Sequence, residues 1–250
     1  MGLAIILGDA DYSQSGLGQV TLKGQGGGDD VPTQNGLTHD YDAYGAGGAT
    51  LTDKKSTTTI TLNGSYLNNY ISLNSGSSDS MQVSSRAACG AMVDGLYTWT
   101  LEIVAKVSGW NATQDTPLYA DYGSEANGKI QIHLGTNGSK TAGVYVRNNR
   151  AWLFDEMANA NNAVDYTAPH TFHLVRALES TSSTFKLYID GVLVDTAQIE
   201  IYYSTIAKAS DILHATGERL LYAVRSYDRE ISEAEALANH KYNVARYNFT

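Results

Sequence analysis

Apolar and polar residues alternate with a period of two in several short segments of this chain, and this pattern constrains its fold most. In residues 97–107 every second side chain is apolar or aromatic, including Trp99, Leu101 and Ile103. Such alternation predicts a strand with one buried face. The same alternation recurs in residues 129–134, 144–146, 172–174 and 185–189.

Turn residues separate these segments. Asp190-Gly191 follows directly after residues 185–189 and is typical of a two-residue hairpin turn, with Val192 and Val194 on the return strand. Many short strands joined by Gly, Asn and Asp turns predict an all-β fold, either a sandwich or a barrel. The predicted core contains Trp99, Leu101, Ile103, Phe185, Leu187 and Ile189.

The two ends of the chain differ from this pattern. Ser232 and Glu235 form a capping box, which predicts a short C-terminal helix. The residues that continue at helical spacing are Ala234, Leu237, Ala238, Lys241 and Ala245. Residues 1–35 have little pattern and include a Gly-rich stretch at 24–28, so we expect either an arm on a flexible hinge or a peripheral edge strand, followed by one domain at 36–250.

Charge and composition exclude several classes of protein. The net charge is −9 and the basic residues are scattered apart from Lys54-Lys55, so nucleic-acid binding is not expected. No apolar run approaches the roughly 20 residues of a membrane-spanning helix. Cys89 is the single cysteine, which fits folding in a reducing compartment, and residues 1–7 lack the positive start of a secretory signal.

Two later segments resemble laminin-G-like domains of the concanavalin A-like lectin-glucanase superfamily. Residues 170–195 (HTFHLVRALESTSSTFKLYIDGVLVD) are similar to that family's W/F-H-x-V strand followed by a K-L-Y-x-D-G hairpin. Residues 220–243 (LLYAVRSYDREISEAEALANHKYN) resemble its closing strand and helix, with Ile231 where leucine is usual. Residues 97–107 resemble the strand that opens the second half of the domain.

The resemblance covers about residues 36–247 and implies a jelly-roll β-sandwich of two antiparallel sheets with a short C-terminal helix. It also implies glycan or protein ligands on the concave face or the rim loops. The superfamily includes lectins, adhesion modules, glycoside hydrolases and viral structural proteins, so the fold alone leaves the function open.

Catalytic residues are not expected in this chain. Hydrolases of the superfamily commonly carry Glu-x-Asp-x-x-Glu on one strand, and no such string occurs here. Glu102 is the only acid of residues 97–107, with Lys106 on the same face, and we expect it to be solvated or paired across strands. Asp155-Glu156 are adjacent, so in a strand they would point to opposite faces and could not act as a pair.

No cofactor is expected either. His170 and His173 are three residues apart in a predicted strand, which sends them to opposite faces and prevents joint metal binding. Residues 40–45 (DYDAYG) resemble the start of a calcium loop, but Leu51 stands where the loop needs a bidentate glutamate. We therefore predict a first strand and turn there, with calcium binding as the alternative.

Aromatic residues provide the candidate ligand site. Tyr outnumbers Phe by 17 to 4, and tyrosine combines a flat apolar face with a polar tip. Trp110, Tyr119, Tyr122 and Trp152 lie beside Asn, Asp and Gly and are candidates for stacking on sugar rings. The alternative is that they cap the ends of the sandwich.

The sequence and the resemblance together favour a non-enzymatic recognition or structural module. We expect a bacteriophage virion protein, such as a capsid decoration, fibre or tail component, that adheres to glycans. Its expected location is the virion or an extracellular surface. Its expected partners are glycans or other virion or surface proteins, and a homo-oligomer is compatible with this role. The alternatives are a carbohydrate-binding module of a secreted bacterial protein or a glycoside hydrolase.

Overall fold

The computed structural model describes two short strands near the start of the chain and eleven segments of the domain that follows. These are residues 12–14, 20–22, 32–62, 64–73, 98–108, 116–121, 129–136, 139–148, 151–157, 168–179, 182–200, 210–212 and 218–249.

The larger of two main antiparallel sheets has eight strands. In spatial order it contains β15 (Val192–Glu200), β14 (Ser182–Ile189), β13 (His170–Glu179), β8 (Trp99–Ser108), β17 (Glu218–Tyr227), β7 (Tyr70–Leu73) and β6 (Gly64–Leu67), and β3 (Leu37–Asp42) also pairs with β17. The central position of β17 matters for the site below. This strand, near the end of the chain, pairs with β3 and β7 from the start of the domain and with β8 from its middle.

The second main sheet has five strands, and two short hairpins complete the strands. The five-stranded sheet runs β12 (Ala151–Met157), β11 (Ser139–Asn148), β10 (Lys129–Thr136), β9 (Thr116–Asp121) and β16 (Ser210–Ile212). The hairpins are β4 (Thr50–Thr52) with β5 (Thr59–Thr61), and β1 (Tyr12–Gln14) with β2 (Val20–Leu22).

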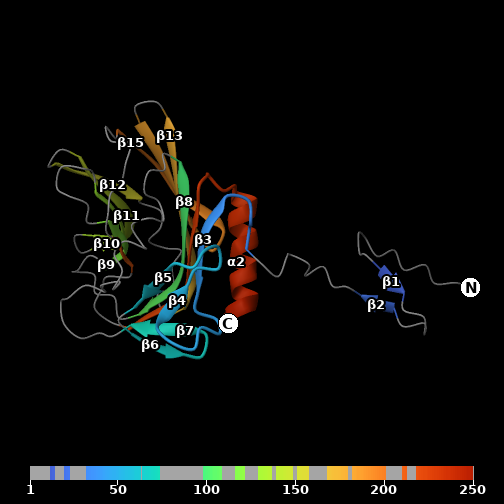
Figure 1. Ribbon diagram of the computed structural model, residues 1–250. Coiled ribbons are helices and arrows are strands. Elements are labelled where there is room, and N and C mark those ends of the chain that lie inside the picture. Colours follow the sequence, from blue (N-terminus) through green and yellow to red (C-terminus); the bar gives the residue numbers. More distant parts are fainter. Residues whose placement is uncertain are drawn as a thin grey trace, which may run out of the picture.

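The five-stranded sheet lies on one side of β8, and helix α2 (Glu233–Tyr247) lies on the other (Figure 1). The predicted all-β sandwich of antiparallel sheets with a short C-terminal helix is therefore confirmed. Within the described residues, no helix has the length and hydrophobicity needed to cross a membrane.

The hydrophobic core forms rows across the large sheet. Leu101 of β8 lies opposite Leu174 of β13, which lies opposite Leu187 of β14. Trp99 is fully buried, and its ring centroid is 6.4 Å from that of Phe185. The side chains predicted for the core are confirmed, with exposed fractions of at most 3% for Trp99, Leu101, Ile103, Phe185, Leu187 and Ile189.

The predicted turn at Asp190-Gly191 is also confirmed. Asp190 has φ +54° and Gly191 has φ +80°, the two positive values that a tight hairpin between β14 and β15 requires. Gly191 is needed for a second reason, since a Cβ there would lie 2.5 Å from Cα of Leu237 on α2. The hairpin tip therefore packs directly against the helix backbone.

Helix α2 begins with the predicted capping box. The Ser232 hydroxyl accepts from the Glu235 amide, and the Glu235 carboxylate accepts from the Ser232 amide. The predicted helix is confirmed, and the residues named for its spacing are all exposed: Ala234, Leu237, Ala238, Lys241 and Ala245. The buried residues are Ala236, Asn239, Asn243 and Tyr247. The helix instead turns two asparagines inward because the sheet beneath it carries buried charges.

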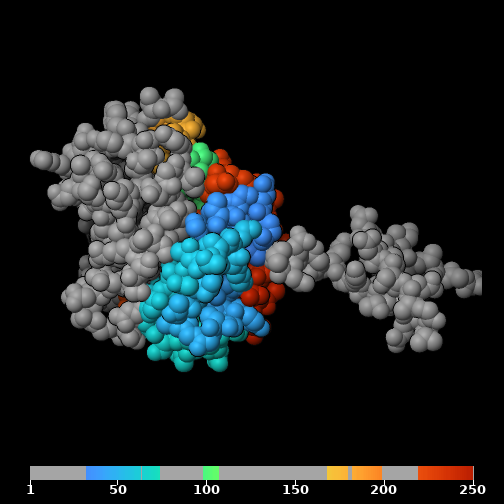
Figure 2. Space-filling view, in the orientation of Figure 1, coloured from blue at the N-terminus to red at the C-terminus, as the bar shows by residue number. Residues whose placement is uncertain are grey.

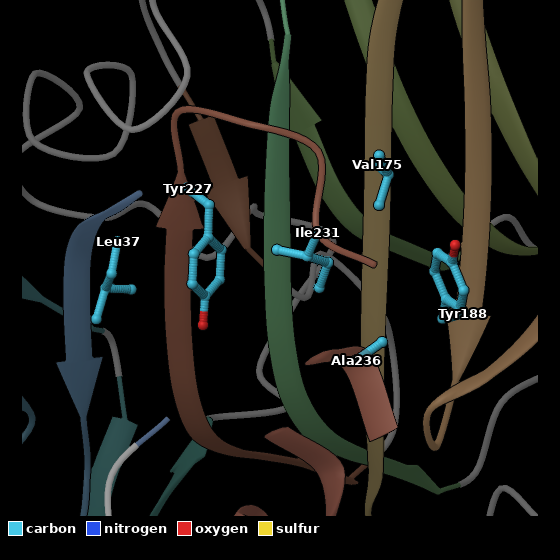
Figure 3. Close-up of a cluster of buried hydrophobic side chains, with 6 residues drawn as sticks. All are labelled: Leu37, Val175, Tyr188, Tyr227, Ile231 and Ala236. Atoms are coloured by element: carbon cyan, nitrogen blue, oxygen red, sulfur yellow. The ribbon is translucent and has the colours of Figure 1, made fainter. Parts of the chain in front are cut away.

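An apolar cluster anchors the first turn of α2 to the sheet. It joins β3, β13, β14 and β17 to the segment that leads into the helix (Figure 3). Its members are Leu37, Val175, Tyr188, Tyr227, Ile231 and Ala236. A second cluster, formed by Val104, Leu220, Tyr222, Ala223 and Tyr247, holds the last turn. Both ends of the helix are therefore fixed on the large sheet.

The division into residues 1–35 and 36–250 stays a prediction. Strands β1 and β2 pair with each other. Pro32 is buried, and the amide of Thr33 donates to Oδ1 of Asn239 at 2.8 Å. These contacts favour a body that begins near residue 32, so deletion of residues 1–31 is the appropriate test of an independent arm.

Candidate functional site

The four aromatic residues predicted to bind ligand are not tested by the structure. Trp110 and Tyr122 lie outside the described residues. Tyr119 is placed on β9 opposite Ile132, and Trp152 on β12 opposite Arg147, with β10 and β11 between the two strands. Only their backbone positions are described, so a shared sugar site remains a prediction. Asp155 and Glu156 occupy consecutive positions of β12, and Cys89 lies outside the described residues.

Glu102 is the centre of a buried polar cluster beneath α2. It lies directly opposite Arg225 of β17 in the sheet register, and its Oε1 accepts from Nη1 of Arg225. The expectation of pairing across strands is confirmed. The expectation of a solvated side chain was wrong, because Glu102 is fully buried.

Side chains of α2 complete the hydrogen bonds of Glu102. Nδ2 of Asn243 donates to Oε1 at 2.8 Å, and Nδ2 of Asn239 donates to Oε2 at 2.9 Å. The hydroxyl of Tyr227 donates to Oε2 at 3.1 Å. Burial opposes ionisation, but the charge of Arg225 and the hydrogen bonds hold the pKa of Glu102 well below its usual value. Glu102 is therefore a charged structural residue sealed between sheet and helix, where no substrate reaches it.

The two histidines singled out by their spacing face opposite sides of the large sheet, as predicted. His173 lies opposite Glu102 and contacts its carboxylate, with Nε2 3.4 Å from Oε2. His170 lies on the side of Phe172, and its Nδ1 is 2.6 Å from Oδ2 of Asp190. In the part of the chain that the structure describes, no group of three His, Cys, Asp or Glu residues is arranged to hold a metal ion.

Residues 40–45 form the end of β3 and a turn, as the strand interpretation predicted. The two carboxylates of this segment contact basic side chains. Nε of Arg225 donates to Oδ1 of Asp40 at 2.8 Å. Asp42 accepts from Nζ of Lys54 at 2.6 Å and from Nε of Arg246 at 2.7 Å.

Asp42 organises the surroundings of Tyr44, the most exposed aromatic residue among those whose side chains the structure describes. Its Oδ1 accepts from the Tyr44 amide at 2.7 Å and from the Tyr247 hydroxyl at 2.8 Å. Burial raises the pKa of Asp42, but the hydrogen bond and charge of Lys54 outweigh this and lower it below the usual value. The carboxylate therefore stays ionised and holds four partners, which are Tyr44 in the turn after β3, Lys54, and Arg246 and Tyr247 of α2.

We name the exposed side of this cluster the Tyr44 surface, formed by Tyr44, Lys54, Tyr242 and Arg246 over the buried Asp42. Tyr44 is 45% exposed, and Cζ of Arg246 lies over its ring, 4.4 Å from the centroid. The same guanidinium carbon is 5.8 Å from the ring centroid of Tyr242. The side chain of Lys54 is 44% exposed. Arg246 thus supports the Tyr44 ring on one face and leaves much of the ring accessible.

The loop that follows Tyr44 leaves space beside this surface. A Cβ built on Gly45, Gly47 or Gly48 would meet no atom within 4 Å. Figure 2 shows the segment from β3 to β7, in blue to cyan, as one continuous face with α2, in red, along its border. The Tyr44 surface is formed where these two parts of the chain meet, since Arg246 and Tyr242 come from α2.

Sequence reasoning missed this surface. Tyr44 was considered only as the fifth position of a calcium loop. The tyrosine directly before the glycine-rich stretch at residues 45–48 was a local signal for an exposed aromatic side chain. No local signal indicated the contribution of Arg246, because this residue bonds Asp42 across 204 residues of sequence.

Comparison with known proteins identifies the fold. No family model and no curated protein matches the sequence. Three similar solved structures concern bacterial toxins. The first is from a study titled "Cell entry of botulinum neurotoxin type C is dependent upon interaction with two ganglioside molecules", with a TM-score of 0.57, 13% identity, and coverage of 83% of this chain and 51% of that one.

The other two are described as binding domains. That of botulinum neurotoxin DC in complex with rat synaptotagmin II has a TM-score of 0.56 and 13% identity over 83% of this chain and 51% of that one. That of Paraclostridial Mosquitocidal Protein 1 has a TM-score of 0.56 and 13% identity over 82% of this chain and 52% of that one. This chain thus spans about half the length of each. At this identity the likeness establishes the β-sandwich fold and leaves the function to the site.

Proposed function

We propose that this protein is a non-enzymatic recognition module that binds carbohydrate through aromatic side chains at its surface. The observation that carries the proposal is the Tyr44 surface, in which Tyr44 is 45% exposed and its ring is covered on one side by Arg246, which Asp42 holds in place. Sugar rings stack on such aromatic faces, and fixed polar groups nearby orient their hydroxyls.

The similar solved structures support a binding role. Two are described as binding domains, and the third is titled for an interaction with ganglioside molecules. Gangliosides carry sugars on their surface-exposed part. The ligand named for that neighbouring structure is therefore of the same class, carbohydrate, as the ligand proposed for this chain. The low sequence identity means that the ligand residues must be tested in this chain directly.

The buried state of Glu102 supports a role without catalysis. A glycoside hydrolase needs two carboxylates about 5 to 10 Å apart that flank the sugar. The only acid of residues 97–107 is instead sealed under α2 and neutralised by Arg225. Incubation with laminarin, xylan and agarose should release no reducing sugar.

A glycan array with the full chain tests the proposal. Stacking on an aromatic face contributes about 0.5 to 1.5 kcal/mol beyond area burial, so Tyr44→Ala should weaken binding by about 2- to 12-fold. Tyr66→Ala is the matched control, because Tyr66 is a half-buried tyrosine on β6 outside the Tyr44 surface. Equal binding by the wild type and Tyr44→Ala would exclude Tyr44 from the ligand site.

The array also compares this surface with the aromatic set predicted from the sequence. Tyr122→Ala and Trp152→Ala should weaken binding several-fold without lowering the melting temperature if those residues form the ligand site. If they lower stability and leave binding intact, they cap the sandwich. Loss of binding in those variants and not in Tyr44→Ala would assign the site to the aromatic set predicted from the sequence.

The biological setting follows from the sequence argument. We propose a bacteriophage virion protein displayed on the particle surface, because a recognition fold with a single cysteine suits assembly in a reducing cytoplasm. Capsid or tail genes beside its gene would support this setting. Polysaccharide-utilisation genes would favour a carbohydrate-binding module of a secreted bacterial protein. Light scattering of the purified chain would establish whether it forms a homo-oligomer.

A further inference from the structure

We propose that the ligand of the Tyr44 surface is an acidic sugar, whose carboxylate binds Arg246 and Lys54 while its ring stacks on Tyr44. This inference rests on the proposed function and names the ligand class of the same site. The hydrogen-bond pattern of the Arg246 guanidinium, the outward position of the basic groups and the exposed Tyr44 support it.

Two nitrogens of the Arg246 guanidinium make no hydrogen bond to the described residues. Its Nε donates to Oδ2 of Asp42 at 2.7 Å, which fixes the plane of the guanidinium. Among the described residues, neither Nη1 nor Nη2 of Arg246 has a hydrogen-bond partner, and the side chain is 24% exposed. Two parallel N–H donors of one guanidinium match the two oxygens of a carboxylate. An already oriented fork loses little conformational entropy when it binds such a group.

The charges of this cluster are arranged with basic groups toward the surface. The side chains of Lys54 and Arg246 are partly exposed, whereas the carboxylates beneath them are buried. Together with the buried Arg225, these two cations balance the three carboxylates of Asp40, Asp42 and Glu102. A ligand at the surface therefore lies nearer to the cations than to the carboxylates. Because Coulomb energies fall with distance and exposed charges are screened beyond about 8 Å at physiological salt, the nearest charges favour an anionic ligand.

Tyr44 adds selection for a ring. Arg246 covers one face of its side chain, and 45% of the residue remains exposed beside the open glycine loop. A free carboxylate would use the fork alone, whereas a sugar that carries a carboxylate on its ring can use the fork and the aromatic face together. Uronic acids and sialic acids both have this chemistry.

The test uses isothermal titration of the full chain with four probes. Trigalacturonic acid and 3′-sialyllactose represent the two sources of acidic sugar, the methyl ester of trigalacturonic acid is the uncharged analogue of the first, and lactose is the neutral counterpart of the second. We expect at least one acidic probe to bind about 10-fold or more tightly than its uncharged counterpart. This difference in affinity is the one expected for a single charge-assisted hydrogen bond. Raising the salt concentration should weaken the acidic probe only.

Variants locate the effect. Arg246→Lys keeps the positive charge beside Asp42 and removes the two parallel donors, so it should weaken the acidic probe about 5- to 20-fold and reduce the preference for the acidic over the uncharged probe. Lys54→Gln should weaken the acidic probe to a smaller extent. Lys241→Gln removes one exposed charge from α2 outside the site and should have no effect. A melting temperature within about 2 °C of wild type checks that Arg246→Lys remains folded.

The outcomes separate the two proposals. Equal affinity for the acidic and uncharged probes, with loss of both in Tyr44→Ala, would overturn the acidic-sugar inference and keep the proposed function. Unchanged affinity of the acidic probe in both Arg246→Lys and Lys54→Gln would also overturn it. Absence of binding to every sugar on the array would remove the proposed function itself. A preference confined to one acidic probe supports the inference and identifies the source.

Discussion

Replacing Glu102 with glutamine is expected to destabilise the fold strongly, although the two side chains have nearly the same shape. Oε1 of Glu102 accepts from Arg225 and Asn243, and Oε2 accepts from Tyr227 and Asn239. Glutamine keeps one oxygen. In one orientation its amide nitrogen faces the donors of Arg225 and Asn243; in the other it faces Nδ2 of Asn239 and the Tyr227 hydroxyl, which can turn to accept. In both orientations Arg225 loses the nearer of its two counter-ions.

The cost follows from the burial of the cluster. Removing one partner of a buried, hydrogen-bonded ion pair costs about 3 to 5 kcal/mol, because the other charge stays desolvated. For a protein of this size each kcal/mol shifts the melting temperature by about 2 to 4 °C, so Glu102→Gln should lower it by about 6 to 20 °C. Urea unfolding with an unchanged m-value would give the free energy directly.

Two further variants make this prediction specific. Glu179→Gln changes an exposed glutamate at the end of β13 and should stay within about 0.5 kcal/mol of wild type. Glu102→Leu combined with Arg225→Met should cost less than the sum of the two single variants, because the ion pair is lost only once and Asp40 keeps Lys54 at 3.8 Å as a basic neighbour. A change below about 1 kcal/mol in Glu102→Gln, or strictly additive effects in the double variant, would refute the buried ion pair.

Four other predictions follow from the described contacts. Trp99→Ala should cost about 3 to 5 kcal/mol through the cavity it leaves, measured by urea unfolding. Gly191→Ala should lower the melting temperature, because φ is +80° and the new Cβ would lie 2.5 Å from the α2 backbone. Arg176→Met should leave stability equal or higher, because burial lowers the pKa of Arg176 to about 10 and neither Nη atom has a partner among the described residues; a loss above about 2 kcal/mol in urea unfolding would contradict this. The Arg229 hydrogen bond lowers the pKa of Glu235 to about 2 despite partial burial. The stability that the ionised Glu235 carboxylate contributes to the fold is therefore complete above about pH 4.5 and is lost as the pH falls toward 2. Glu235→Gln should therefore be less stable than wild type at pH 6, and the difference should shrink in acid.

Short-range patterns of the sequence determined most of the fold. The alternation in residues 97–107 was sufficient to place Trp99 and Leu101 in the core, because successive strand residues face opposite sides whatever the partner strands are. Asp190-Gly191 and the capping box of Ser232 and Glu235 were equally reliable. Each depends on contacts between residues a few positions apart, which the local sequence specifies.

The tertiary structure alone decided which face of α2 is buried and where the Tyr44 surface lies. Helical spacing predicted the helix without indicating which face is buried. Strand order places β17 between β8 and β3, so Glu102, Arg225 and Asp40 meet beneath the helix. Buried charges need hydrogen-bond partners more than apolar contacts, and Asn239 and Asn243 supply them. The bond between Arg246 and Asp42 spans 204 residues and depends on that docking. No periodicity within a segment encodes the order of strands in a sheet, and for that reason the charges, the helix face and the exposed tyrosine beside them became visible only in three dimensions.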